Sequence, residues 1–347
     1  MSPKPSSRAS SSASLPRAFD KELAELDALK GATLDAAAIE NLREALGHRN
    51  NFIVAKAAKL VADAELAALL PDVLAAYQRF FADPVKTDPQ CWAKNALVKA
   101  LVKLEHRAKD AYLRGLRHHQ LEPVWGGQSD TAGTLRGECA HALVDCPGIS
   151  DAELLTVLLE PLVDTEKTVR VEAARAIGQV GGISAALLLR LRILLAPATH
   201  DKDEPEVLGA VFSALLGLER TQAIPLVAGF LKEGDDLAAE AAFALSELRT
   251  PEALAALVGR YRAGVDAWFG SVLLSAIALT RLPEAMDFLL DLIARDAREA
   301  PSAIEAIGRA APSAEQRAHV EQAVKAAGSQ RLEQAFRQHL PALPERC

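Results

Sequence analysis

The stretch TVRVEAARAIGQVGG, residues 168–182, decides the fold. Its apolar residues recur at steps of three and four and therefore form one stripe of an amphipathic helix, namely Val169, Ala173, Ala176, Ile177 and Val180. The glycines that follow end the helix. A helix this short, with a narrow seam made largely of alanine, is not stable alone in water. The chain must therefore supply other helices against which it packs.

The same apolar spacing recurs along most of the chain. The residues equivalent to Ile177 are Val61, Leu101, Leu143, Leu215, Leu245, Leu279 and Ile307. Successive copies lie between 28 and 42 residues apart, and a second apolar helix follows each copy after a short turn. One such unit cannot bury both of its faces, whereas stacked neighbours create a continuous core. The pattern predicts an all-α fold of about eight helix-turn-helix repeats.

The segment DTEKTVRVEAARAIGQVGG, residues 164–182, resembles a HEAT repeat, in particular the short bacterial form known as the phycobilisome-lyase-like HEAT repeat. The matching residues are Asp164, Val169, Arg170, Ala173, Ala174, Ala176, Ile177, Gly178 and Gly181. The resemblance covers roughly residues 35 to 326 and implies a right-handed α-solenoid, with first helices on the convex side and second helices lining a concave groove. It does not specify a function, because the family includes scaffolds, lyases and nucleic-acid binders.

The expected organisation is one solenoid over residues 19–340, with capping helix pairs at 19–48 and 313–340. Residues 1–18 are Ser-rich and are predicted to be a disordered tail, with a targeting peptide as the alternative. A short tail is expected at 341–347. No apolar run reaches the roughly 18 to 20 residues that cross a bilayer, and the four cysteines show no CxxC pair. These features predict a cytoplasmic protein that does not enter a membrane.

Charge is distributed unevenly along the chain. Residues 1–120 carry 18 Lys and Arg against 14 Asp and Glu, whereas the remainder carries 21 against 32. Helical phase places several arginines on the polar side of the second helices, namely Arg79, Arg114, Arg117, Arg190 and Arg260. Arginine is well suited to bidentate contact with carboxylates. We expect these residues to anchor an acidic or extended segment of another protein; the alternative is a solvated helix face.

The longest segment without a helical pattern is LEPVWGGQSDTAGTLRG, residues 121–137. It places Trp125 beside two glycines, and an aromatic residue in such a loop is a typical contact element. The alternative is that Trp125 folds back over the junction between two repeats.

Other functional classes have weaker support in the sequence. Phosphate-binding glycine loops and the G-x-S-x-G elbow are absent, and none of the eight histidines precedes Glu, as di-iron HEAT-like hydroxylases would require. Two groups are considered as metal ligands but match no zinc spacing, namely Cys139, His141 and Cys146, and His106, His118 and His119. We therefore predict a non-enzymatic protein-binding scaffold without cofactor or metal. The alternatives are a nucleic-acid binder that resembles HEAT-like DNA-repair glycosylases, and a lyase-like regulatory subunit.

Overall fold

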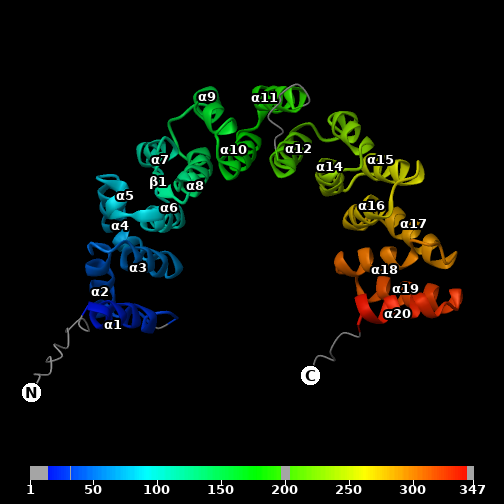
Figure 1. Ribbon diagram of the computed structural model, residues 1–347, viewed down its shortest axis with the longest axis horizontal. Coiled ribbons are helices and arrows are strands. Elements are labelled where there is room, and N and C mark those ends of the chain that lie inside the picture. Colours follow the sequence, from blue (N-terminus) through cyan, green and yellow to red (C-terminus); the bar gives the residue numbers. More distant parts are fainter. Residues whose placement is uncertain (1–14, 32, 197–203, 342–347) are drawn as a thin grey trace, which may run out of the picture. The chain divides into compact units, whose positions relative to one another are not determined.

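The computed structural model describes residues 15–31, 33–196 and 204–341, and nearly all of its regular structure is helical (Figure 1). The prediction of an all-α fold is confirmed, with one two-stranded sheet as the exception. The chain divides into two compact units, Met1–Ser150 and Asp151–Cys347. No helix in the described part of the chain is long and apolar enough to span a membrane.

The first unit is built around α3 and α6. Helix α3 packs against α1, α2 and α6, while α6 also contacts α4 and α8, and α7 packs against α8. The elements are α1 (Leu15–Ala28), α2 (Ala36–Leu46), α3 (Asn51–Asp63), the 3-10 turn η1 (Ala67–Leu69), α4 (Leu70–Arg79), α5 (Pro84–Thr87), the 3-10 turn η2 (Pro89–Cys91), α6 (Trp92–Lys103), α7 (Lys109–Leu116), β1 (Leu121–Val124), β2 (Gly127–Asp130) and α8 (Gly133–Val144).

Helix α1 begins at Leu15, which lies inside the predicted tail of residues 1–18. The rest of that tail, residues 1–14, lies outside the described residues. The predicted boundary lies a few residues later because Pro16 continues the serine- and proline-rich composition of residues 1–14, although the first turn of a helix tolerates proline.

The segment 121–137 is not irregular, contrary to the sequence-based expectation. It forms an antiparallel hairpin in which Leu121 pairs with Asp130 and Val124 with Gly127, followed by the first turn of α8. The two-residue loop is Trp125-Gly126, and Gly126 has φ +89°, which an L-residue rarely adopts. The strands are too short and too polar to show the alternation that marks a strand in sequence.

Asp130 anchors this hairpin to the helices. Its carboxylate accepts hydrogen bonds from the backbone N–H groups of Gln120 and Ala132, both at 3.0 Å, and Arg136 donates to it at 2.8 Å. Burial opposes ionisation of Asp130, but these donors, together with His119, outweigh it and lower the pKa to about 2. The carboxylate is thus ionised at neutral pH and holds the base of the hairpin.

The second unit is a succession of helix pairs. Helix α10 packs on α12, and the same relation links α12 to α14, α14 to α16, α16 to α18 and α18 to α20. The elements are α9 (Asp151–Leu162), α10 (Lys167–Val180), α11 (Gly182–Leu195), α12 (Pro205–Glu219), the 3-10 turn η3 (Arg220–Gln222), α13 (Ile224–Ala228), the 3-10 turn η4 (Gly229–Lys232), α14 (Asp236–Glu247), α15 (Pro251–Arg262), α16 (Ala267–Leu279), α17 (Pro283–Ala294), α18 (Ala300–Arg309), α19 (Ala314–Ala327) and α20 (Gln330–His339).

The residues aligned with Ile177 in the sequence are buried, with one exception. Leu279 is only partly buried, whereas Ile277, two residues earlier, is fully buried in α16. Helix α16 is apolar nearly all round, so its sequence gives no sharp phase and the alignment slipped by two residues. The residues that the alignment placed correctly in the core are Val61, Leu101, Leu143, Ile177, Leu215, Leu245 and Ile307.

Glycine at position 178 permits the close approach of α10 and α12. A Cβ atom added there would lie 2.9 Å from the Cβ of Ala214 and 3.3 Å from its Cα. Real Cβ atoms do not come this close, so a side chain at 178 would force the two helices apart.

We therefore expect Gly178→Leu to lower the free energy of unfolding by about 1–3 kcal/mol, the usual cost of overpacking. Gly217→Leu, on the exposed face of α12, is the matched control, because a Cβ there meets nothing within 4 Å. Urea denaturation of both variants makes the comparison. Equal stability of the two would show that α10 and α12 do not meet at Gly178.

Candidate functional site

An open groove of about 1050 Å³ lies in the first unit between α1, α3 and α6. We call it the α3–α6 groove. Its floor is made of small residues, since Ala55, Ala62 and Ala96 line it, and Phe19 and Leu23 of α1 form one wall. The remaining lining residues are Phe52, Lys56, Lys59, Asp63, Gln90, Trp92, Asn95, Lys99 and Lys103.

Two exposed aromatic residues mark one end of the groove. Phe52 and Trp92 are 45% and 48% exposed, and their ring centroids lie 4.9 Å apart at an interplanar angle of 50°. Each stands in the first turn of its helix, α3 or α6. Aromatic residues that are half exposed and already in contact present a large apolar surface whose shape is fixed before a partner arrives.

Four lysines surround the apolar floor. Lys99 pairs with Glu138 at 3.2 Å, Lys103 with Glu65 at 2.8 Å, and Lys56 with Asp27. Lys59 is exposed and has no ion pair with any described residue. The lysine pairs lie at the surface, and exposed pairs contribute only about 0–1 kcal/mol. These lysines are therefore available to a carboxylate that a ligand brings into the groove.

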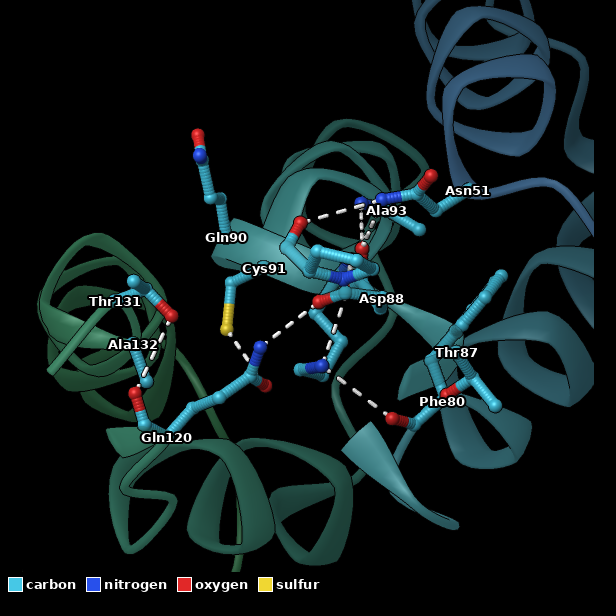
Figure 2. A network of polar contacts seen from close by, with 12 residues as sticks. Asn51, Phe80, Thr87, Asp88, Gln90, Cys91, Ala93, Gln120, Thr131 and Ala132 are labelled. Carbon is cyan, nitrogen blue, oxygen red and sulfur yellow. Dashed lines mark hydrogen bonds and ion pairs between the residues drawn. The ribbon is translucent and has the colours of Figure 1, made fainter. Parts of the chain in front are cut away.

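A buried ion pair lies at the N-terminus of α6, and Figure 2 shows the network of polar contacts around its carboxylate, Asp88. Asp88 and Lys94 are both fully buried and lie 3.0 Å apart. The Asp88 carboxylate also accepts hydrogen bonds from the N–H groups of Ala93 and Lys94, at 2.8 and 3.0 Å, and from Nδ2 of Asn51 at 3.1 Å. One side chain thus holds the N-terminus of α6 against the start of α3, next to Trp92 and Phe52.

The same network continues to the hairpin. Nε2 of Gln120 donates to the Asp88 carbonyl at 2.8 Å, and the Cys91 thiol donates to Oε1 of Gln120 at 3.2 Å. Burial raises the pKa of Cys91 to about 11, so that the group is a neutral donor. Gln90 and Cys91 adopt left-handed φ values of +59° and +54°, which non-glycine residues rarely do. This turn directs Gln90 outward, where its side chain accepts a hydrogen bond from Nε1 of Trp92 at 3.1 Å.

Three of the five arginines expected to bind a partner make hydrogen bonds or ion pairs within the chain. Arg79 donates to the carbonyls of Leu46 and His48, at the end of α2, at 3.0 and 3.1 Å. Arg260 donates to three carbonyls, those of Leu231, Lys232 and Gly264. Arg190 forms a bidentate pair with Glu219, at the end of α12. Each of these side chains joins neighbouring helical elements of the fold.

The other two predicted anchors are exposed. The guanidinium of Arg114 lies over the ring of Phe81, 4.4 Å from its centroid, and Arg117 is exposed just after α7. Neither residue lines the α3–α6 groove. The structure therefore does not place Arg79, Arg114 or Arg117 in the α3–α6 groove.

Trp125 stands at the tip of the hairpin and is fully exposed. It does not cover a junction between repeats, so that alternative is wrong. The contact role remains a prediction, since a lone aromatic at a hairpin tip has no pocket of its own.

The residues considered as metal ligands have other partners. Cys139 lies 3.7 Å from the Tyr77 hydroxyl, Cys146 donates to the Ala142 carbonyl, and His119 bonds to Asp130. His106 packs against Tyr112, and His118 against Phe81. Within the described ranges, no three His, Cys, Asp or Glu residues are placed to hold a metal ion.

The sequence did not single out Phe52, Trp92 or Lys59. Phe52 and Trp92 each directly precede a buried residue, Ile53 or Ala93, so a phase error of one residue hides them in the core. One signal in the sequence could have identified the two aromatic residues. Phe52 and Trp92 lie 40 residues apart, which is also the separation of Val61 and Leu101, so they occupy the same position in two successive copies of the pattern.

No known family model matches the chain, and no curated protein matches its sequence. The likeness to HEAT repeats therefore rests on residues 164–182 and on the apolar periodicity.

We expect Asp88→Asn to lower the free energy of unfolding by about 3–5 kcal/mol, because it leaves the buried Lys94 ammonium without a counter-charge. Addition of Lys94→Met should restore part of this loss, since an apolar side chain tolerates burial. Asp83→Asn, at an exposed pair with Lys86, is the control and should change little. Chemical denaturation measures the free energy of unfolding of all three variants. A loss below about 1 kcal/mol for Asp88→Asn would contradict the role given to the buried ion pair.

Proposed function

We propose that the protein is a non-enzymatic scaffold that binds another protein through the α3–α6 groove. The ligand is an amphipathic helical segment with acidic residues beside its apolar face. The observation that carries this proposal is the preformed pair of exposed rings, Phe52 and Trp92, at the end of a floor of alanines bordered by lysines.

A helical-repeat architecture supports a scaffold function. In the second unit, α10, α12, α14, α16 and α18 pack on one another in order, and α11, α15 and α17 each pack against a member of this row. We propose from this alternation that the chain is a right-handed α-solenoid of HEAT-like repeats. Such repeats offer long surfaces whose shape is fixed by the stack, and they bind extended or helical segments of partners.

The dimensions of the groove favour a helical ligand. Helix α3 has 13 residues, which at 1.5 Å per residue gives a wall of about 20 Å. A ligand helix of roughly 12 residues matches that length. The alanine floor allows the backbone of such a helix to approach closely, and the exposed rings supply an anchor for a large apolar side chain, as in helix-in-groove recognition.

The charges of the lining select the ligand. Four lysines and one aspartate line the groove. Glu or Asp residues on the flanks of a ligand helix would replace the carboxylates that now pair weakly with Lys56, Lys99 and Lys103. They would also give Lys59 a partner. Complementary rim charges raise the association rate and suppress wrong partners.

Single-stranded nucleic acid is the second candidate, because rings interleaved with lysines also form stacking platforms. One observation favours the protein ligand. The two rings are already in contact, so no base inserts between them. A lyase-like subunit remains a separate prediction, which the absorption spectrum of the purified protein tests.

We expect a fluorescent peptide of roughly 12 residues, with Leu on one face and Glu on both flanks, to bind the wild-type chain more tightly than the same peptide with Lys flanks. Trp92→Ala should weaken binding about 30-fold, as loss of an aromatic hot spot of about 2 kcal/mol does. Lys59→Glu/Lys99→Glu should weaken it at least about tenfold. Fluorescence anisotropy at two salt concentrations measures each affinity.

Lys86→Glu is the matched control, since Lys86 is exposed in the same unit but does not line the groove. Equal affinity for the two peptides, or no effect of Trp92→Ala, would contradict the proposal. Tighter binding of a labelled single-stranded oligonucleotide, lost in Lys59→Glu/Lys99→Glu, would favour the nucleic-acid candidate instead.

A further inference from the structure

Helix α11 exposes an apolar stripe to solvent. Its stripe residues are 53% to 80% exposed and lie at steps of four, four and three, namely Ile183, Leu187, Leu191 and Leu194. The opposite face of the helix is buried through Ala185, Leu189 and Ile193, and α11 packs there against α10 and α12. A helix that is apolar on both faces normally lies inside a larger assembly.

Helix α9, which contacts α11, also has exposed apolar side chains at and just beyond its C-terminal end. Leu159 is 42% exposed, and Val163, just after the helix, is 69% exposed. Isolated exposed aliphatic residues need no explanation, but six on two contacting elements are the mark of an interaction surface.

The residues outside the described ranges carry few large apolar side chains. They comprise residues 1–14, 32, 197–203 and 342–347, and their only large apolar side chains are Met1 and Leu343. The segment next to α11, residues 197–203, reads PATHDKD and is mostly polar and charged. An apolar surface of another molecule would match the stripe.

A small pocket lies beside one end of the stripe. It has a volume of about 370 Å³ and lies between the start of α11 and the end of α12, with Ile183, Ala186, Leu187 and Leu218 among its lining. Glu219 and Gln222 also line it, and Arg190 pairs with the Glu219 carboxylate, so the pocket presents apolar and polar groups together. The protruding Leu194 lies at the other end of the same helix, 11 residues from Ile183.

A pocket at one end of a helix and a protruding side chain at the other end are complementary to the same features of a second copy related by a two-fold axis. If two copies of α11 lie antiparallel, Leu194 of each copy meets the pocket beside Ile183 of the other, and Leu187 faces Leu191 near the axis. Both contacts form at once because the spacing of about 16 Å along the helix is the same in each copy. The helix dipoles also oppose each other favourably in this arrangement.

We propose that the protein forms a two-fold symmetric dimer through antiparallel pairing of the α11 stripes. A fully exposed aliphatic side chain of this size offers roughly 100 Å² of apolar surface. The six side chains of α9 and α11 therefore supply roughly 350 Å² per copy, which is somewhat under half of a standard interface of about 800 Å² per partner. A contact of this size is expected to form a reversible dimer.

The composition of this region disfavours a membrane as the occupant. Helices that lie on membranes carry a polar face rich in Lys and Arg, which anionic lipids attract. The basic residues of α11 are Arg190 and Arg192, and Arg190 is engaged with Glu219. Residues 121–347 carry 21 Lys and Arg against 32 Asp and Glu, so an anionic surface would repel this part of the chain.

Sedimentation equilibrium of the full chain over a range of concentrations tests the proposal. The wild type should approach twice 37.0 kDa as its concentration rises, whereas Leu187→Glu/Leu191→Glu should remain at 37.0 kDa with an unchanged circular dichroism spectrum. Phe243→Glu, an exposed apolar position on α14, is the control and should dimerise as the wild type does. A wild type that stays monomeric, or a dimer that survives Leu187→Glu/Leu191→Glu, would overturn the proposal, and binding of a wild-type monomer to anionic vesicles would assign the stripe to membranes.

Cross-linking tests the antiparallel geometry. Ile183→Cys/Leu194→Cys places thiols about 16 Å apart within one chain, too far to bond, but opposite each other across the two-fold axis. Mild oxidation in a Cys347→Ser background should give a covalent dimer, whereas Ile183→Cys alone should not. A covalent dimer from Ile183→Cys alone would indicate parallel pairing and contradict the proposed arrangement.

Discussion

The first unit depends on the burial of one ion pair, Asp88 with Lys94. Removing both charges from water is costly, and the pair persists because each remaining polar atom finds a donor or an acceptor. The Asp88 carboxylate accepts from the N-terminus of α6 and from Asn51 at the start of α3, while Nζ of Lys94 also donates to the Phe80 carbonyl at 3.3 Å. Because this geometry ties two helix starts together, the rings of Phe52 and Trp92 stand side by side, and the proposed binding groove follows from the pair.

The sequence predicted the helical class and most of the core, because apolar spacing at three and four residues reports directly which face of a helix is buried. It failed where that spacing carries no information. Helix α16 is apolar nearly all round, so its sequence does not show which face is buried, and the sequence pattern predicted Leu279 in the core in place of Ile277. The hairpin at 121–130 depends on Asp130, which makes its contacts with Gln120, Ala132 and Arg136, and contacts between separate elements leave no local pattern in a sequence.

Three of the arginines predicted to bind a partner have partners within the chain, and the chemistry of arginine explains why. Helical phase placed Arg79, Arg190 and Arg260 on polar faces, but their five donors also satisfy the unpaired carbonyls and carboxylates at the ends of neighbouring helices. Arg331 does the same for Asp296 and the carbonyls that follow it. Where short helices pack against one another in succession, such ends recur along the chain, so an arginine on a polar face often joins two elements of the chain. Helical phase alone does not distinguish an arginine that joins two elements of the chain from one that binds a partner.

The most direct test of the proposed groove uses the indole N–H signals of the three tryptophans. Trp92 lies in the groove, Trp125 at the hairpin tip and Trp268 in the second unit. The Nε1–H resonances, recorded during titration with the acidic amphipathic peptide, report on these three places at once. The account predicts that the Trp92 signal shifts saturably while the Trp125 and Trp268 signals stay in place. A shift confined to Trp125, or an unchanged Trp92 signal at saturating peptide, would contradict it.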